Sequence, residues 1–186
     1  HLKVSLSQED FIAQVNRIGL AVIGQSEGLA PADKKLYALR DVTGTVDSIP
    51  LIASSVMSKK LASGAQAILL DVKVGSGAFM KTIDDARALA KAMVDIGREN
   101  GRSVKAVLTD MDRPLGHAIG NALEIREVID TLKGHGPDDL THECIIMAAH
   151  MLVLSHICDY ETALTRVREA LDSGDALERL RLMIDA

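Results

Sequence analysis

One helical stripe in the sequence carries the residue types that a planar polar ligand needs. Ile52, Ser55 and Lys59 are spaced i, i+3 and i+7 in a helix predicted over 48–61, so they share one face. A hydroxyl, an ammonium and an aliphatic side chain on one stripe suit a ring that has polar edges. This stripe is therefore the first candidate binding site.

A second stripe lies on the preceding predicted helix, which begins near Pro31. Tyr37 and Arg40 share a face there, and the planar guanidinium of Arg40 matches carbonyl or carboxylate edges. The glycine-rich segment 75–81 would let Phe79 fold over a ring. Spacing alone nevertheless favours a plainer interpretation, in which Arg40 and Lys59 are solvated surface charges and Phe79 is a core residue.

Two familiar catalytic motifs begin in the sequence and then fail. His142-Glu143 opens like a zinc-protease motif, but Ile146 stands where the second histidine must be. Gly75-Ser76-Gly77 opens like a dinucleotide-binding loop, but Met80 replaces its last glycine. Neither motif therefore supports a function.

Composition excludes several classes of protein. The chain has 186 residues, enough for one domain or slightly more, with 47% hydrophobic and 25% charged residues. The net charge of −5 and an aromatic content of 2% disfavour a nucleic-acid partner. The first residues have no apolar core, so we expect no signal peptide, and no run is long enough to span a membrane. The two cysteines indicate buried thiols in a reducing, cytoplasmic compartment.

The elements that must position these side chains form an α/β pattern. Strands are predicted over 67–74 and 104–110, and Thr82 caps an amphipathic helix between them. Such a unit predicts a parallel sheet with flanking helices. A short buried strand is also predicted over 20–23. Further helices are expected over 7–18, 120–133, 138–156, 159–173 and 175–185; the helix over 138–156 is apolar almost all round, so it should be buried or lie at an interface.

Four stretches of the sequence resemble the pyrimidine-nucleoside phosphorylase and thymidine phosphorylase family. They are Tyr37–Lys60 (YALRDVTGTVDSIPLIASSVMSKK), Asp71–Met80 (DVKVGSGAFM), Leu108–Asp112 (LTDMD) and Gly120–Glu127 (GNALEIRE). Several long motifs in the right order are more specific than one short pattern. The resemblance implies part of a nucleoside phosphorylase class II fold. Residues 1–30 and 64–186 would belong to its central α/β domain, and residues 31–63 to its helical, dimerisation lobe.

The resemblance also assigns roles to the candidate site. In the family, the residues that match Arg40, Ser55 and Lys59 hydrogen-bond the pyrimidine. The residue that matches Tyr37 lies at the same site. Apolar walls around the base match Val46, Ile52 and Phe79. Arg40 and Lys59 would act catalytically, by stabilising the negative charge on the departing base.

The family resemblance implies a potassium ion but no organic cofactor. In bacterial members, the ion's ligands match the carbonyls of Leu115 and Ala118 and the carboxylate of Glu127. Phosphate is the co-substrate, a pyrimidine nucleoside or base is the substrate, and the family forms homodimers. No membrane partner is implied.

The implied activity is that of a pentosyltransferase in pyrimidine salvage: reversible phosphorolysis of a pyrimidine (deoxy)nucleoside to free base and (deoxy)ribose 1-phosphate. Family members carry an upstream glycine-rich phosphate loop that has no counterpart in these residues. We therefore expect the chain to be an internal fragment that holds the base-binding half of the site and does not catalyse the reaction alone. Two alternatives remain at this point: a phosphoribosyltransferase of the anthranilate type, which uses magnesium, and a non-catalytic scaffold or interaction module.

Overall fold

The computed structural model describes residues 4–24 and 28–186, and their contacts divide into two compact units. One, called here the sheet unit, comprises residues 28–115 and 146–163. The other, called here the helical unit, comprises residues 4–24, 116–145 and 164–186. Each unit is described by itself below.

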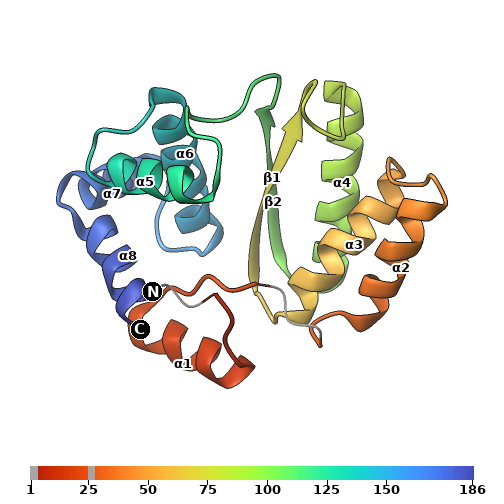
Figure 1. Cartoon of the computed structure of the whole chain (residues 1–186), viewed down its shortest axis with the longest axis horizontal. Helices are drawn as coiled ribbons and strands as arrows, with labels where there is room; N and C mark the ends of the chain where they lie inside the picture. The colour runs from red at the N-terminus through yellow and green to blue at the C-terminus, as the bar shows by residue number, and fades with distance from the viewer. Residues whose placement is uncertain (1–3, 25–27) are drawn as a thin grey trace. The chain divides into compact units, whose positions relative to one another are not determined.

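The sheet unit is built on two parallel strands. β1 (Ala67–Val74) pairs with β2 (Ser103–Asp110), with Ala67 opposite Ser103 and Val74 opposite Asp110. The connection between them contains α4 (Ile83–Glu99), which packs on both strands (Figure 1). This arrangement confirms the predicted parallel sheet with flanking helices.

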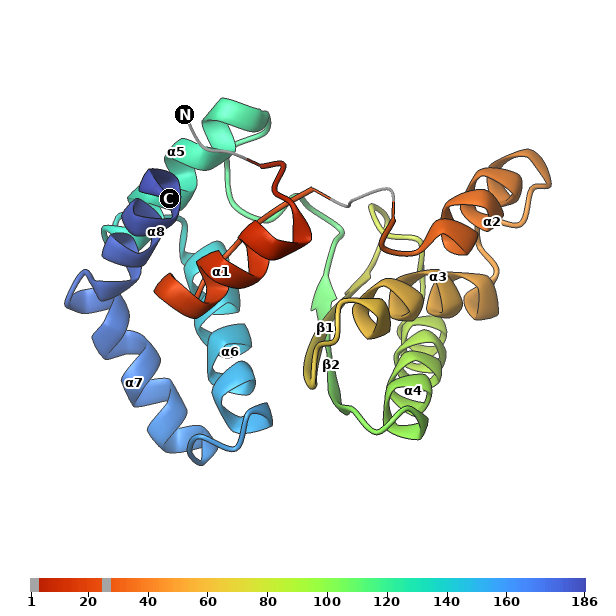
Figure 2. The same ribbon diagram turned by 90° about the horizontal axis from the view of Figure 1, so that it is seen from below.

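Two more helices extend the sheet unit away from the strands. α3 (Ile49–Ala62) packs against α4, and α2 (Pro31–Val42) packs against α3. Both views place α3 between α2 and the layer formed by the sheet and α4 (Figures 1 and 2). The two helices that carry the candidate site are therefore neighbours.

A continuous apolar core joins α3, the strands and α4. Alternate residues of β1 point into it, because successive side chains of a strand lie on opposite faces. Gly97 allows α4 to approach β2 closely, since a Cβ there would overlap Val104 and touch Met57. The buried core residues are Ile52, Ala53, Met57, Ile68, Leu70, Val72, Met80, Ala86, Leu89, Ala90, Met93 and Val104.

Side-chain caps start two of the predicted helices. Thr82 Oγ1 accepts the backbone N–H of Asp85 at 3.2 Å at the start of α4, and Ser7 Oγ accepts that of Asp10 at 3.1 Å at the start of α1. Each cap satisfies a backbone donor that has no partner inside its helix. Gly64, two residues after the end of α3, has the left-handed φ of 79° that glycine tolerates.

The remaining elements are helices. They are α1 (Gln8–Ile18), α5 (Asn121–Leu132), α6 (Asp138–Leu154), α7 (Tyr160–Asp172) and α8 (Asp175–Asp185), and the sequence predicted each of them within a few residues. In the helical unit, α8 packs against α1 and α5. None of the helices in the described residues is long and apolar enough to cross a membrane.

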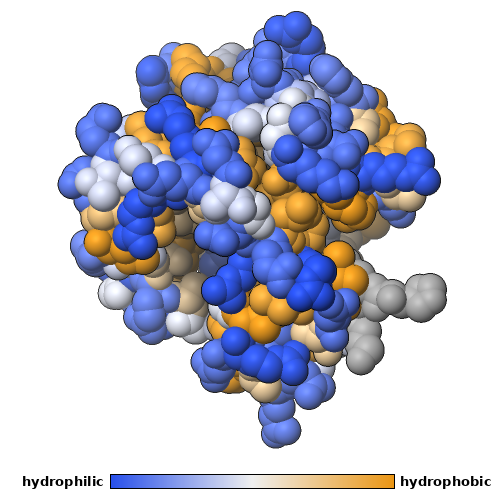
Figure 3. Space-filling model, turned by 90° about the vertical axis from the view of Figure 1, so that its left-hand side faces the viewer, coloured by the Kyte–Doolittle hydropathy of each residue, from blue (hydrophilic) through white to orange (hydrophobic). Residues whose placement is uncertain are grey.

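The helical unit buries little apolar surface. Ile18 and Met183 are buried there, whereas Leu123, Ile125 and Val128 of α5 remain 39–52% exposed. Figure 3 shows hydrophobic patches between hydrophilic residues on one face of the molecule.

Two local predictions were wrong. Residues 20–24 form no strand, and Val22 is 55% exposed, because neither of the two described strands pairs with this segment. Cys144 is exposed rather than buried. The apolar helix α6 has a single buried residue among those described, Ala149, so of its two predicted placements the interface stays a prediction. An apolar run indicates a need for burial, but it does not supply the partner that buries it.

Candidate functional site

A cavity of about 270 Å³ lies between α2 and α3. Its volume is near the lower end of ligand pockets, which is the size expected for a small ring. Polar groups from both helices line it together with apolar side chains. The lining residues are Asp33, Leu36, Tyr37, Leu39, Arg40, Thr43, Thr45, Leu51, Ser54 and Ser55.

Arg40 is buried in the wall of this cavity. Its relative exposure is 6%, and its Cζ lies 4.8 Å from the centre of the Tyr37 ring. Its Nε atom is buried and has no hydrogen-bond partner. A buried donor without a partner typically costs about 1–3 kcal/mol. The interpretation of Arg40 as a solvated surface charge is therefore wrong.

Lys59 is held at the same site by two oxygen atoms. Its Nζ donates to Asp33 Oδ2 at 2.7 Å and to Ser55 Oγ at 3.0 Å. It also lies 5.8 Å from the centre of the Tyr37 ring. The structure thus brings four of the predicted site residues together. They are the cations Arg40 and Lys59, the hydroxyl of Ser55 and the ring of Tyr37.

Asp33 belongs to this cluster, and the sequence analysis missed it. Its side chain is 10% exposed and makes an ion pair with Lys59. Burial favours its neutral form, but hydrogen bonds from Lys59 and Ser55 and the charges of Lys59 and Arg40 outweigh burial and lower its pKa. The available signal was spacing: Asp33, Tyr37 and Arg40 stand at i, i+4 and i+7 on one face of α2.

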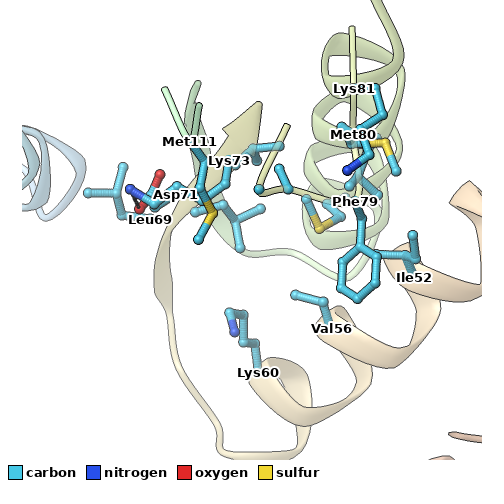
Figure 4. Close-up of a pocket in the computed structure, with 16 residues that line it drawn as sticks. Ile52, Val56, Lys60, Leu69, Asp71, Lys73, Phe79, Met80, Lys81 and Met111 are labelled. Atoms are coloured by element: carbon cyan, nitrogen blue, oxygen red, sulfur yellow. Dashed lines mark ion pairs between the residues drawn. The ribbon is translucent and has the colours of Figure 1, made fainter. Parts of the chain in front are cut away.

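The apolar residues of the predicted site are placed differently. Ile52 and Phe79 line a larger cavity of about 700 Å³ between α3, β1 and the loop that follows β1. Figure 4 shows the Phe79 ring beside Ile52, although Phe79 is 57% exposed. Val46 is half-buried in the loop between α2 and α3 and lines neither of these two cavities.

Lys60 brings a further cation to the larger cavity. Its side chain extends from α3 toward β1, next to Val56 (Figure 4). Burial, and then the charge of Lys59, lower the pKa of the Lys60 ammonium. Lys59 and Lys60 are adjacent in sequence but differ in surroundings: Lys59 contacts Asp33 and Ser55, and Lys60 lines the larger cavity.

The acid expected to bind potassium lies against a loop of the helical unit. Glu127 Oε1 accepts the backbone N–H groups of His117 and Ala118, at 2.9 and 3.0 Å. The carboxylate is therefore held beside Ala118, whose carbonyl the expected site also uses. Carboxylate and carbonyl oxygens are ligands that suit a hard cation, and here Glu127 Oε1 is engaged by two backbone N–H groups. Leu115 is the last residue before Gly116 and belongs to the sheet unit.

Comparison of the chain with known families gives the class of protein. Residues 1–177 match the family described as "Glycosyl transferase family, a/b domain", so the chain belongs to that family.

Curated relatives narrow the similarity further. The chain is 58% identical to the pyrimidine-nucleoside phosphorylase of Staphylococcus haemolyticus (strain JCSC1435) over 183 residues, and 55% identical to that of Geobacillus stearothermophilus over 184 residues. Each match covers 98% of this chain and 42% of the relative. The enzyme of Staphylococcus aureus (strain bovine RF122 / ET3-1) is 58% identical, over 97% of this chain and 42% of that protein. The chain therefore spans less than half the length of the relatives that it matches.

Proposed function

We propose that this chain supplies the pyrimidine-binding part of a pyrimidine-nucleoside phosphorylase. The observation that carries the proposal is the buried Arg40, whose Nε lacks a partner and which lines the same small cavity as Ser55. A pyrimidine carbonyl in this cavity would accept from the part of the Arg40 guanidinium that lines it. The relatives that are 55–58% identical bear the corresponding name.

The proposed reaction is reversible phosphorolysis in a protein of the relatives' full length. Breaking the glycosidic bond leaves negative charge on the base, spread over its ring nitrogen and carbonyl oxygens. Arg40 and Lys59 are fixed cations, already oriented by burial and by Asp33. Preorganised donors stabilise charge that develops in the transition state more than they stabilise the neutral ground state.

We propose that the larger cavity holds the sugar side of the nucleoside. Ile52 and Phe79 would pack against apolar parts of the nucleoside, and Lys60 adds a cation at the edge of the space. We also propose potassium at Ala118 and Glu127, with Leu115 as a third ligand. When bound, the ion would tie the loop at 115–118 to α5. A cytoplasmic homodimer that uses phosphate as co-substrate completes the proposal.

A binding experiment tests the proposed function on this chain. Uracil and thymine are titrated into the protein, and binding is followed by NMR chemical shifts. We expect saturable binding to the wild type and a loss of affinity of about 10-fold or more in Arg40→Ala, because a buried charged hydrogen bond is removed. Arg87→Ala, which changes an exposed arginine of α4, is the matched control.

Kinetics in a full-length enzyme test the catalytic roles. We expect Arg40→Ala and Lys59→Ala each to lower kcat/KM by at least about 10-fold, equivalent to roughly 1.4 kcal/mol. Lys91→Ala, in an exposed ion pair with Asp95 on α4, is the control for lysine. Unchanged kinetics in both site variants would refute the assignment of the site. Absence of any pyrimidine binding would favour the non-catalytic scaffold instead.

A further inference from the structure

We infer that Asp112 is a positioning residue, which holds the loop 75–81 so that the Phe79 ring lies in the larger cavity before a nucleoside binds there. The loop follows the end of β1, and Asp112 follows the end of β2. Among the described residues, Met111 lines this cavity and Asp112 does not, so Asp112 acts through the loop. The inference rests on the proposed function, in which the larger cavity receives part of the nucleoside.

The Phe79 ring lacks the packing that would fix it by itself. It lies beside Ile52 in the larger cavity and is 57% exposed, whereas its neighbours Ala78 and Met80 are buried (Figure 4). Close packing fixes side chains in a protein interior, but a ring that is more than half exposed has few such contacts. The position of the ring therefore depends on the backbone of the loop that carries it.

Four successive backbone N–H groups hold this loop. Those of Gly75, Gly77 and Ala78 donate to backbone carbonyls at 2.9–3.0 Å. The N–H of Ser76 donates instead to a side chain, at 2.7 Å to Asp112 Oδ1. A carboxylate acceptor makes a shorter and stronger hydrogen bond than a neutral one. Of these four contacts, the one with Asp112 can be removed by substituting its acceptor.

Asp112 is itself anchored to the end of β2. Its backbone N–H donates to Asp110 Oδ1 at 2.9 Å, and Asp110 is paired with Val74 where the two strands end. Ser76 Oγ also donates to the backbone carbonyl of Asp112, at 3.4 Å. The carboxylate thus ties the loop to the fixed ends of both strands.

Two glycines allow the loop to come this close. A Cβ at Gly75 would lie 2.7 Å from the backbone nitrogen of Asp112, and a Cβ at Gly77 would lie 2.7 Å from the backbone oxygen of Met111. Gly75 also has a φ of 132°, which residues with a side chain rarely adopt. The glycine-rich sequence of the loop is therefore what lets the Ser76 N–H reach Asp112.

The tie to Asp112 bears on binding through the position of the ring. A side chain that is already in place does not have to be ordered when the ligand arrives, which improves affinity. When the ring is in place for only a fraction of the time, the apparent dissociation constant rises by the inverse of that fraction. Loss of the bond between Ser76 and Asp112 frees the loop and lowers the fraction.

The test is a double-mutant cycle on the dissociation constant for uridine, measured by NMR titration. We expect Asp112→Ala to weaken binding about 3- to 10-fold, as the ring is in place less often. When Phe79→Ala is already present, adding Asp112→Ala should weaken binding by less than about 2-fold, because the ring through which Asp112 acts is gone. Independent losses that multiply in the double variant would show a merely structural role and overturn the inference.

Two control variants isolate the hydrogen bond. Asp112→Asn keeps an oxygen acceptor for the Ser76 N–H and should retain the wild-type affinity within about 2-fold. Asp84→Ala removes an exposed carboxylate from α4 and should leave the affinity unchanged. A folded Asp112→Ala protein that binds uridine as tightly as the wild type would overturn the inference and leave the proposed function intact. Failure of the wild type to bind uridine would overturn both.

The wild type without ligand supplies a second measurement, should Asp112→Ala fail to fold. We expect nuclear Overhauser contacts between the Phe79 ring and the Ile52 methyl groups, because the ring is placed before a ligand binds. The amide proton of Ser76 should exchange slowly with solvent, because Asp112 accepts it. Absence of these contacts, or unprotected exchange at Ser76, would overturn the inference.

Discussion

The sheet unit and the helical unit are stabilised in different ways. In the sheet unit, α3, α4 and the strands share one cluster of buried apolar side chains, with Met57 fully buried at its centre. In the helical unit, the described buried side chains are those of Ile18, Thr131 and Met183. Polar contacts are prominent there instead: Arg179 donates to the carbonyl of Ile18 at 2.9 Å, and Glu127 accepts two backbone N–H groups.

The difference bears on function. A binding site needs side chains whose positions are fixed before the ligand arrives, and close packing supplies that fixation. The cavity that holds Arg40 and Ser55 is built on α3, whose other face lies in the apolar core. The helical unit instead exposes apolar side chains of α5.

The largest expected effect comes from truncating one methionine in each unit. We expect Met57→Ala to lower the free energy of unfolding by about 2–5 kcal/mol, because it removes a fully buried side chain and leaves a cavity. Met183→Ala makes the same chemical change at a residue that is 7% exposed in a thinly packed unit, and should cost less. Urea unfolding measures both. Equal losses would contradict the difference in packing between the units.

A second prediction concerns the polar contacts of the helical unit. Glu127→Ala leaves the N–H groups of His117 and Ala118 without their acceptor, so we expect a loss of about 1–3 kcal/mol. Hydrogen exchange at these two amides should accelerate. Glu124→Ala is the control, because Glu124 accepts only the N–H of Gly120 in the described structure. Unaltered exchange at His117 and Ala118 would show that the carboxylate does not hold the loop.

The helix caps at Thr82 and Ser7 allow the loss of one capping hydroxyl to be compared between the two units. Thr82→Ala and Ser7→Ala each remove a side-chain oxygen that accepts one backbone N–H. We expect Thr82→Ala to cost about 1 kcal/mol of global stability, because α4 is part of the core. Ser7→Ala should instead fray α1 locally. Circular dichroism during thermal unfolding measures the global stability, and hydrogen exchange in α1 measures the local fraying. An equal loss of global stability in both variants would contradict the prediction.

The smallest expected effect is a pH dependence in the sheet unit. Burial, and then the charge of Lys105, lower the pKa of His150. His150 Nδ1 lies 3.0 Å from Lys105 Nζ, and its ring stacks on Tyr160. The pKa of His150 in the folded protein lies below its unfolded value of about 6.5. Its contribution to the free energy of unfolding is therefore complete above that pH. It is lost as the pH falls through the folded pKa.

Thermal unfolding across this pH range measures the effect. We expect the unfolding temperature of His150→Gln to depend less on pH than that of the wild type. His142→Gln, at an exposed position of α6, should behave like the wild type. Identical pH profiles for all three proteins would show that His150 does not contribute.

Much of the fold was accessible from sequence because its signals are local. Strand β1 began with four apolar residues, Ala67–Leu70, and continued with charged and apolar residues in alternation. Helix α4 combined a threonine cap with apolar residues every three or four positions. The strand predicted over 20–23 failed because strand formation requires a neighbouring strand, which no local pattern guarantees.

The sequence by itself determined the residue types and spacings on α2 and α3, and therefore which side chains share a helix face. Only the tertiary structure decided that Arg40 is buried with an unpartnered Nε, and that Asp33 pairs with Lys59, 26 positions further along the chain. Helical periodicity acts over a few residues, whereas the packing of α2 against α3 brings together groups whose separation in sequence carries no signal. The charge state and hydrogen-bonding direction of the site depend on that packing, because burial and close partners set them.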